Sequence, residues 1–271
     1  MSAPAAPTWV LLRGLMRDAR HWGAFPATFA AACPGARIEA VDFPGNGLLH
    51  HQPSPTRVEA MAGHVRAELA RRGLAPPYRV LAMSLGAMAA SAWAEAHPDE
   101  LAACVLVNTS LRPFSPPHWR LRPAAWGPLL RLLLGQADAR TIETAILRLT
   151  SRRAPVEVLA DWTAWRLRHP VSNANALRQL AAAARYVAPR SAPRVPLLIV
   201  SGGADALVDP RCSARLAAAW KVPLRVHGEA GHDLPLDAGD WLAATVRDWA
   251  ATALSPAPAA PAPSAPPRRR P

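Results

Sequence analysis

Short runs rich in apolar residues alternate with longer stretches of mixed polarity over most of the chain. The first four runs each lead into a glycine, a serine or an asparagine, and they cover residues 8–12, 36–43, 78–83 and 101–107. Runs of this length, bounded by turn-forming residues, are typical of strands buried in a parallel sheet. Between them the chain predicts helices over residues 23–32, over residues 56–72 and from Ser84 onward.

The same alternation returns in the C-terminal third. Runs that begin at residue 195 and cover residues 224–227 predict two more strands, with a helix between them that ends near Trp220. Asp209 and Pro210 are suited to begin this helix as its N-cap and its first residue. The whole chain therefore predicts strands and helices in alternation, which is typical of a parallel sheet covered on both faces.

The sequence also indicates where two helices begin and which C-terminal residues are disordered. Thr56 and Glu59 form the S/T-x-x-E pattern of a capping box, which predicts that Thr56 caps the helix that follows. A last helix is predicted over residues 238–254. Residues 255–271 are almost only alanine, proline, serine and arginine, and this composition predicts a disordered tail.

Residues 111–190 have a different pattern, with proline clusters, leucines at helical spacing and no convincing strand. We expect this segment to be a helical insertion. Its tryptophans are candidates for lining a pocket, although aromatic residues at helical spacing also simply pack. They are Trp119, Trp126, Trp162 and Trp165.

The predicted fold class is α/β, a three-layer α/β/α sandwich around a mostly parallel sheet. Residues 1–110 and 191–254 are expected to form its core. Residues 111–190 are then a helical cap inserted after the fourth strand, and residues 255–271 are the tail.

The strongest chemical signal is the turn at Ser84, between the third run and the alanine-rich helix. A serine nucleophile at a strand-to-helix turn needs small residues two positions before and after it, because the tight turn pushes the hydroxyl clear of the sheet. Ala82 and Gly86 meet this need. Taken alone, the pattern also fits an ordinary turn serine in an alanine-rich chain.

Three loops that follow predicted strands carry Ser84, Asp205 and His232, in this order along the chain. Open parallel sheets bind ligands at the edge where their strands end. Hydrolysis by a serine requires a base that takes its proton and a carboxylate that orients this base. The sequence offers one residue for each of these tasks.

Other residues compete with Asp205 for the carboxylate position. Asp209 is explained as a helix cap, and Asp233 and Asp237 lie too near His232 in the sequence to act from another strand, although either could tune it. Asp42 is expected to brace its loop. The remaining histidines match no motif and are expected to be structural or solvated.

Five segments over residues 8–254 resemble the α/β-hydrolase fold family, of the small bacterial serine esterase type. These segments are residues 13–15, residues 42–47 with the pattern D-x-P-G-x-G, the turn at Ser84, residues 203–210 with the pattern G-x-D-x-x-V-x-P, and residues 231–232. The resemblance implies that Ser84 is the nucleophile, Asp205 the acid and His232 the base.

The resemblance also implies an oxyanion hole formed by the backbone N–H groups of Leu85 and Leu15. The sequence departs from the family here, because Arg13 stands where a histidine is usual. Some family members take the acid from the region of Asn108, which carries no charge in this chain.

The loop over residues 15–22 carries three charges and is expected to be exposed. Arg17 and Arg20 within it could meet an acidic substrate group, although a solvated loop is the simpler interpretation. His21 is noted because it follows the predicted oxyanion loop.

The net charge of +12 raises the alternative of nucleic-acid binding. The basic residues are scattered, and their longest run is residues 268–270, so no specific nucleic-acid partner is expected. Cys33, Cys104 and Cys212 are far apart, which argues against a disulfide framework and a zinc site. No signal segment or membrane span is expected, and a cytoplasmic location is the default.

The function that the resemblance implies is hydrolysis of a small or medium carboxylic ester by Ser84, Asp205 and His232, a reaction that needs neither a metal nor an organic cofactor. Alternatives on the same fold are a thioesterase, an amidase, a C–C bond hydrolase and a perhydrolase. A non-catalytic binding module is a further alternative. The expected partner is a small-molecule ester or thioester substrate, and the expected assembly is a monomer or a homodimer.

Overall fold

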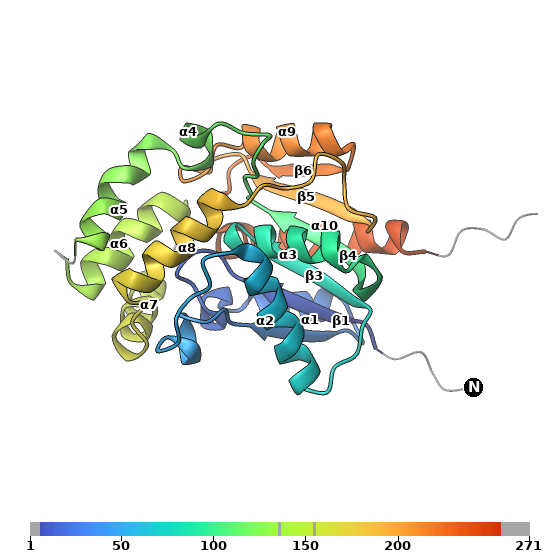
Figure 1. Cartoon of the computed structure of the whole chain (residues 1–271), viewed down its shortest axis with the longest axis horizontal. Helices are drawn as coiled ribbons and strands as arrows, with labels where there is room; N and C mark the ends of the chain where they lie inside the picture. Colours follow the sequence, from blue (N-terminus) through green and yellow to red (C-terminus); the bar gives the residue numbers. More distant parts are fainter. Residues whose placement is uncertain (1–5, 135–136, 154–155, 256–271) are drawn as a thin grey trace, which may run out of the picture.

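A computed structural model of the chain describes residues 6–134, 137–153 and 156–255. Its centre is one parallel sheet with the spatial order β2-β1-β3-β4-β5-β6 (Figure 1). The strands are β1 (Thr8–Leu12), β2 (Arg37–Val41), β3 (Tyr78–Met83), β4 (Leu101–Val107), β5 (Leu197–Gly202) and β6 (Leu224–His227). The predicted α/β class and parallel sheet are confirmed.

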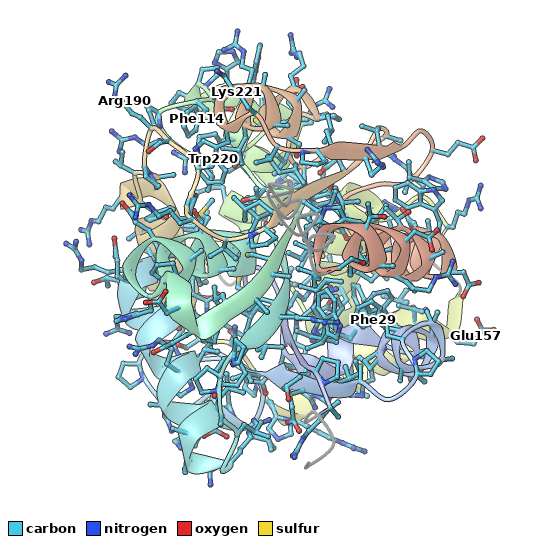
Figure 2. The ribbon with its side chains drawn as sticks, turned by 90° about the vertical axis from the view of Figure 1, so that its right-hand side faces the viewer. Phe29, Phe114, Glu157, Arg190, Trp220 and Lys221 are labelled. Atoms are coloured by element: carbon cyan, nitrogen blue, oxygen red, sulfur yellow. The ribbon has the colours of Figure 1, made fainter. Side chains whose placement is uncertain are left out.

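Helices cover both faces of the sheet. On one face lie α1 (Phe25–Ala32) and α10 (Leu234–Ala253), and on the other lie α2 (Val58–Arg71), α3 (Leu85–Ala96) and α9 (Arg211–Trp220). Each face therefore has its own apolar core. Figure 2 shows Phe29 of α1 on one side of the sheet and Trp220 of α9, beside Phe114, on the other.

Between β4 and β5 the chain forms a helical segment (residues 111–190), which stands at the left of Figure 1. Its helices are α4 (Pro117–Arg120), α5 (Trp126–Leu133), α6 (Ala139–Thr150), α7 (Val156–Arg168) and α8 (Asn173–Arg185). Among the described residues of this segment, strand pairing is limited to one bridge between Arg112 and Val187. Short 3₁₀ helices occur at Ala19–Trp22, Gly47–Leu49, Pro98–Glu100 and Pro123–Ala125.

The order in which successive strands are added to the sheet changes direction at β1. β2 pairs with one side of β1, and β3 then pairs with the other side. In an open parallel sheet, such a switch leaves a crevice at the carboxyl ends of the two strands concerned. The loops that follow β1 and β3, which carry Gly14 and Ser84, meet at this crevice.

Some helix ends differ from their prediction. α2 begins at Val58, so the cap position falls on Arg57 and not on Thr56, and no side chain forms a cap hydrogen bond. α10 begins at Leu234, ahead of the predicted start, and Ala238 interrupts it with non-helical backbone angles. The predicted tail lies outside the described residues, apart from Ser255.

The loop over residues 15–22 is mostly buried, which corrects the expectation of an exposed loop. Arg17, Asp18 and His21 retain 7%, 4% and 7% of their exposure. The charges are buried because they are paired: Arg17 Nη1 lies 2.8 Å from Glu143 Oε2 on α6, and Arg20 Nη2 lies 2.7 Å from Asp18 Oδ2. A loop sequence alone does not reveal a partner carboxylate that lies more than a hundred residues away.

His21 provides a pH-dependent test of this burial. Its ring packs edge-on against Trp162 and Trp165, with centroids 5.1 and 5.4 Å away. Burial, followed by the nearby Arg17, lowers the pKa of His21 to about 4. Between about pH 6.5 and pH 4, His21 therefore binds a proton more readily in the unfolded chain than in the folded chain. The stability that the fold has with His21 buried and neutral is complete above this pH range, and it is lost as the pH falls through the range.

We expect His21→Gln to remove this loss, which amounts to up to about 3 kcal/mol. The measurement is urea unfolding of both proteins at about pH 7 and about pH 4.5. Asp42, whose pKa burial raises to about 6, acts in the opposite direction, so the difference between the two proteins is the relevant quantity. Identical pH dependence in both proteins would contradict a buried, neutral His21.

Candidate active site

Ser84 occupies a strained turn between β3 and α3. Its backbone has φ 55° and ψ −117°, a conformation that a residue with a side chain rarely adopts. Its N–H donates to Val107 O at 2.9 Å, and its carbonyl accepts from Ala87 N at 3.0 Å. A Cβ on Gly86 would lie 2.5 Å from Leu12 O, so the position after the turn accepts only glycine without rearrangement. The requirement for a small residue there has a direct steric cause.

Asp205 and His232 form a buried pair. His232 Nδ1 lies 2.7 Å from Asp205 Oδ2, and both residues are almost fully buried. Asp205 Oδ1 accepts hydrogen bonds from the N–H groups of Leu207 at 2.8 Å and Val208 at 2.9 Å. The carboxylate is therefore fixed by two backbone donors and faces the imidazole with its other oxygen. An imidazole that donates through Nδ1 keeps Nε2 as a proton acceptor.

Ser84 and His232 line the same cavity of about 350 Å³, and Asp205 lies behind His232. The cavity lies between the carboxyl end of the sheet and the helical segment, and its walls are mainly apolar. Ser84 Oγ makes no hydrogen bond to any described residue, His232 included. Without substrate, catalytic hydrogen bonds are often long and tighten on binding. The catalytic tasks assigned to the three residues stay predictions.

The two predicted oxyanion donors also reach this cavity. Leu15 and Leu85 line it, and neither N–H donates to a described residue. A Cβ on Gly14 would lie only 3.0 Å from Ser84 Cβ, so glycine allows the loop after β1 to approach the turn. Gln179 on α8 holds this loop, because its side-chain oxygen accepts from Met16 N at 2.8 Å. Sequence reasoning did not identify Gln179.

Arg13, the departure from the family pattern, is buried in an ion pair with Asp233. Its Nη1 and Nη2 lie 3.1 and 2.6 Å from the two carboxylate oxygens, and its guanidinium lies 4.9 Å from the centre of the Trp22 ring. Burial opposes ionisation of Asp233, but Arg13 outweighs it and holds the pKa of this carboxyl below its usual value. The pair connects the predicted oxyanion loop to the residue after His232.

Removal of one member of this pair should leave an unpaired buried charge. We expect Arg13→Met and Asp233→Leu each to lower the free energy of unfolding by about 3–5 kcal/mol. The double variant should recover most of the lost free energy of unfolding, because it leaves no buried charge without a partner. Urea unfolding of all four proteins checks the expectation, and additive losses in the double variant would contradict it.

Asn108 is a second residue whose task the sequence did not reveal. Its Nδ2 donates to Gly231 O at 3.1 Å and to His232 O at 2.7 Å, while its Oδ1 accepts from Gly202 N at 2.8 Å. It stands where some family members place the acid, and here it fixes the backbone beneath the histidine. Asp237 supports the same loop, since it accepts from Gly231 N at 2.7 Å.

The other weighed carboxylates have structural tasks. Asp209 accepts from Arg211 N at 3.0 Å at the start of α9, although the cap position itself is Pro210. Asp42 accepts from Ala19 N at 2.6 Å, so it braces the neighbouring loop after β1. Neither residue forms a hydrogen bond to His232.

Only one of the four candidate tryptophans lines the large cavity, and it is Trp126. Trp162 packs under the guanidinium of Arg17, with 4.2 Å to the ring centroid. Trp119 lies beside two arginines, with 3.9 Å from its centroid to Arg211 and 4.3 Å to Arg215. Most of these indoles therefore pack against cations and do not contact the cavity.

The described residues contain no group of three or more histidine, cysteine, aspartate or glutamate side chains that could hold a metal ion. Within the same residues, no helix has both the length and the apolar character needed to cross a membrane.

The fold is similar to that of several solved structures. The enol-lactonase from Burkholderia xenovorans LB400 superposes with a TM-score of 0.73 at 23% identity, over 91% of this chain and 92% of that chain. A thermophilic esterase from Thermogutta terrifontis gives a TM-score of 0.72 at 21% identity, over 92% of this chain and 91% of that one. A bacterial membrane phospholipase A gives 0.72 at 18% identity, over 91% of this chain and 79% of that one.

At these identities the likeness shows the fold and not the substrate. No curated protein sequence matches the chain significantly. The family model of the alpha/beta hydrolase fold matches residues 10–238, which is most of the chain and includes every predicted site residue. The chain therefore belongs to the α/β-hydrolase fold family.

Proposed function

We propose that this protein is a serine hydrolase that cleaves small or medium carboxylic esters. The observation that carries the proposal is the 2.7 Å contact between His232 Nδ1 and Asp205 Oδ2, next to a cavity that His232 shares with Ser84. A carboxylate that holds Nδ1 prepares Nε2 to accept a proton from a serine hydroxyl. The strained backbone of Ser84 supports the same interpretation, since strain of this kind is concentrated at functional sites.

In the first half of the proposed reaction, His232 Nε2 takes the proton of Ser84 Oγ while this oxygen attacks the ester carbonyl carbon. The backbone N–H groups of Leu85 and Leu15 stabilise the oxyanion that forms. Asp205 stabilises the imidazolium of His232. The imidazolium then returns its proton to the leaving alkoxide, the bond from carbon to the alcohol oxygen breaks, and an acyl-Ser84 intermediate and a free alcohol remain.

In the second half, water replaces the alcohol. His232 takes a proton from the water as its oxygen attacks the acyl carbon, and the same two N–H groups stabilise the second oxyanion. The proton then passes to Ser84 Oγ as the acyl bond breaks, which releases the carboxylic acid and restores the enzyme. The net reaction consumes one ester and one water.

The cavity supports a substrate of limited size. Its volume of about 350 Å³ lies at the lower end of ordinary ligand pockets. Leucine and methionine side chains form much of its lining, so an apolar acyl or alcohol portion would be desolvated there. Both α5 and α6 of the helical segment contribute lining residues, among them Trp126 and Ile146.

The test combines turnover with labelling. Purified protein is incubated with p-nitrophenyl esters of increasing acyl length, and separately with a fluorophosphonate probe whose attachment is mapped by peptide mass spectrometry. We expect release of nitrophenolate with an optimum at short or medium acyl length, and attachment of the probe to Ser84. Folded protein that neither turns over any ester nor carries the probe would refute the proposal.

A further inference from the structure

The cavity contains more positive than negative charge. Among the described residues that line it, the charged side chains are Arg13, Arg17, Arg120 and Asp233. A cation beside apolar walls is unfavourable unless an anion or hydrogen-bond acceptors compensate it. The partner of each guanidinium therefore determines what else the cavity can bind.

Two of the three guanidinium groups already have a carboxylate. Arg13 pairs with both oxygens of Asp233, at 3.1 and 2.6 Å. Arg17 Nη1 lies 2.8 Å from Glu143, and its guanidinium also faces the ring of Trp162. Arg166 pairs with the same glutamate. Two guanidinium groups therefore share one carboxylate, and no negative charge remains there to compensate another cation in the cavity.

Arg120, the last residue of α4, has no such partner. No carboxylate in the described part of the chain forms an ion pair with it; its Nη2 donates to Ala183 O at 2.7 Å, and its Nε is buried without an acceptor. Its Nη1 makes no hydrogen bond to a described residue. Burial, together with the nearby Arg112, lowers the pKa of Arg120, although an arginine keeps its charge at any physiological pH.

We propose that Arg120 binds a free carboxylate of the substrate, so that the preferred substrates are half-esters of dicarboxylic acids. This inference rests on the proposed ester hydrolysis and names the substrate class for it. A guanidinium and a carboxylate match in shape and charge, and their hydrogen bonds are among the strongest in proteins. A bound monoanion would supply the acceptor that Arg120 lacks and neutralise its charge.

A purely structural explanation of Arg120 exists and can be separated from this one. Its bond to Ala183 O lies in the last turn of α8, where a cation stabilises the carbonyl end of a helix. Arg112 does the same, since its Nη1 donates to Ala184 O at 3.1 Å. Arg112 is exposed and does not line the cavity. It is therefore the matched control.

The experiment compares monoethyl adipate with ethyl adipamate, a neutral ester in which an amide replaces the free carboxylate. Ethanol release gives kcat/KM for both esters with wild type, Arg120→Met, Arg120→Lys and Arg112→Met. In parallel, calorimetry measures binding of both esters to Ser84→Ala and to Ser84→Ala/Arg120→Met, which does not depend on turnover. Monoethyl succinate and monoethyl glutarate, tested in the same way, show which chain length reaches Arg120.

We expect wild type to prefer the half-ester by about tenfold or more, and Arg120→Met to lose this preference because its kcat/KM falls much further for the half-ester than for the neutral ester. Arg120→Lys should keep part of the preference, and Arg112→Met all of it. Equal kcat/KM for both esters in wild type, or equal loss of preference in Arg112→Met, would overturn the inference. If no ester is hydrolysed, the proposed function is refuted, and the calorimetry alone tests the role of Arg120. Tighter binding of the half-ester that is lost in the Arg120→Met variant supports this role. Equal binding of the two esters refutes it.

Discussion

Ser84→Ala should lower kcat for ester hydrolysis by roughly 10⁴- to 10⁶-fold, because the variant keeps the cavity but has no atom that can form the acyl intermediate. The strained turn is held by backbone contacts to Val107 and Ala87, which do not involve the hydroxyl. Ser84 Oγ has no hydrogen bond to a described residue to lose. The free energy of unfolding should therefore change by less than about 1 kcal/mol.

The measurement is the steady-state rate on the best p-nitrophenyl ester, together with a burst experiment for acyl-enzyme formation. Ser110→Ala is the matched control, since Ser110 lines the same cavity and its hydroxyl makes only a 3.5 Å contact with Arg120 O. We expect this control to stay within about tenfold of wild type, as a contact of this length is weak. A Ser84→Ala protein with near wild-type activity would assign the chemistry to another group.

The fold and the position of the candidate site could be predicted because both depend on local sequence. The central strands are apolar runs, β2 and β6 are mixed runs with apolar residues, and each of Ser84, Asp205 and His232 follows a strand within a few residues. Parallel strands place the residues that follow them at one edge of the sheet, so the sequence order and the strand pattern together bring the three side chains close. No contact between distant residues had to be known.

The charged lining of the site could not be predicted, because it depends on pairs that are distant in sequence. Arg13 and Asp233 are 220 residues apart, and Arg17 and Glu143 are 126 apart. In the sequence these residues look like solvated charges on loops and helices. Only the folded chain brings the acids to the loop after β1 and buries Arg17, while no described carboxylate pairs with Arg120.

The tasks of Asn108 and Gln179 could not be predicted for the same reason, because they too depend on contacts between residues that are distant in the sequence. A lone asparagine after a strand, or a glutamine within a helix, has no pattern that marks it as a support of an active-site loop. Their hydrogen bonds to the backbone of His232 and Met16 become visible only when strand β4 and helix α8 are placed in space. Buried amides of this kind are satisfied by backbone groups of other elements, which the sequence does not identify.

Asp205→Asn should lower kcat/KM by about 10⁴-fold while the fold is retained. The two N–H groups of Leu207 and Val208 require an acceptor, so the amide oxygen of the asparagine should take the place of Oδ1. The amide nitrogen then faces His232 Nδ1, where Oδ2 accepted before. Two donors cannot face each other, so Nδ1 becomes the acceptor and Nε2 carries the proton. An imidazole in this tautomer cannot take the proton of Ser84.

Asp209→Asn is the control for this change, because it removes the same charge four residues further along without contact to His232. Its contacts are with Arg211, at the start of α9 and outside the cavity. The two variants are compared by their rates on one neutral ester and by NMR of the imidazole nitrogens, which reports the tautomer directly. We expect the tautomer to invert only in Asp205→Asn, and the activity to fall only there. Loss of activity with an unchanged tautomer would mean that Asp205 acts through its charge on the imidazolium and not through orientation of the ring.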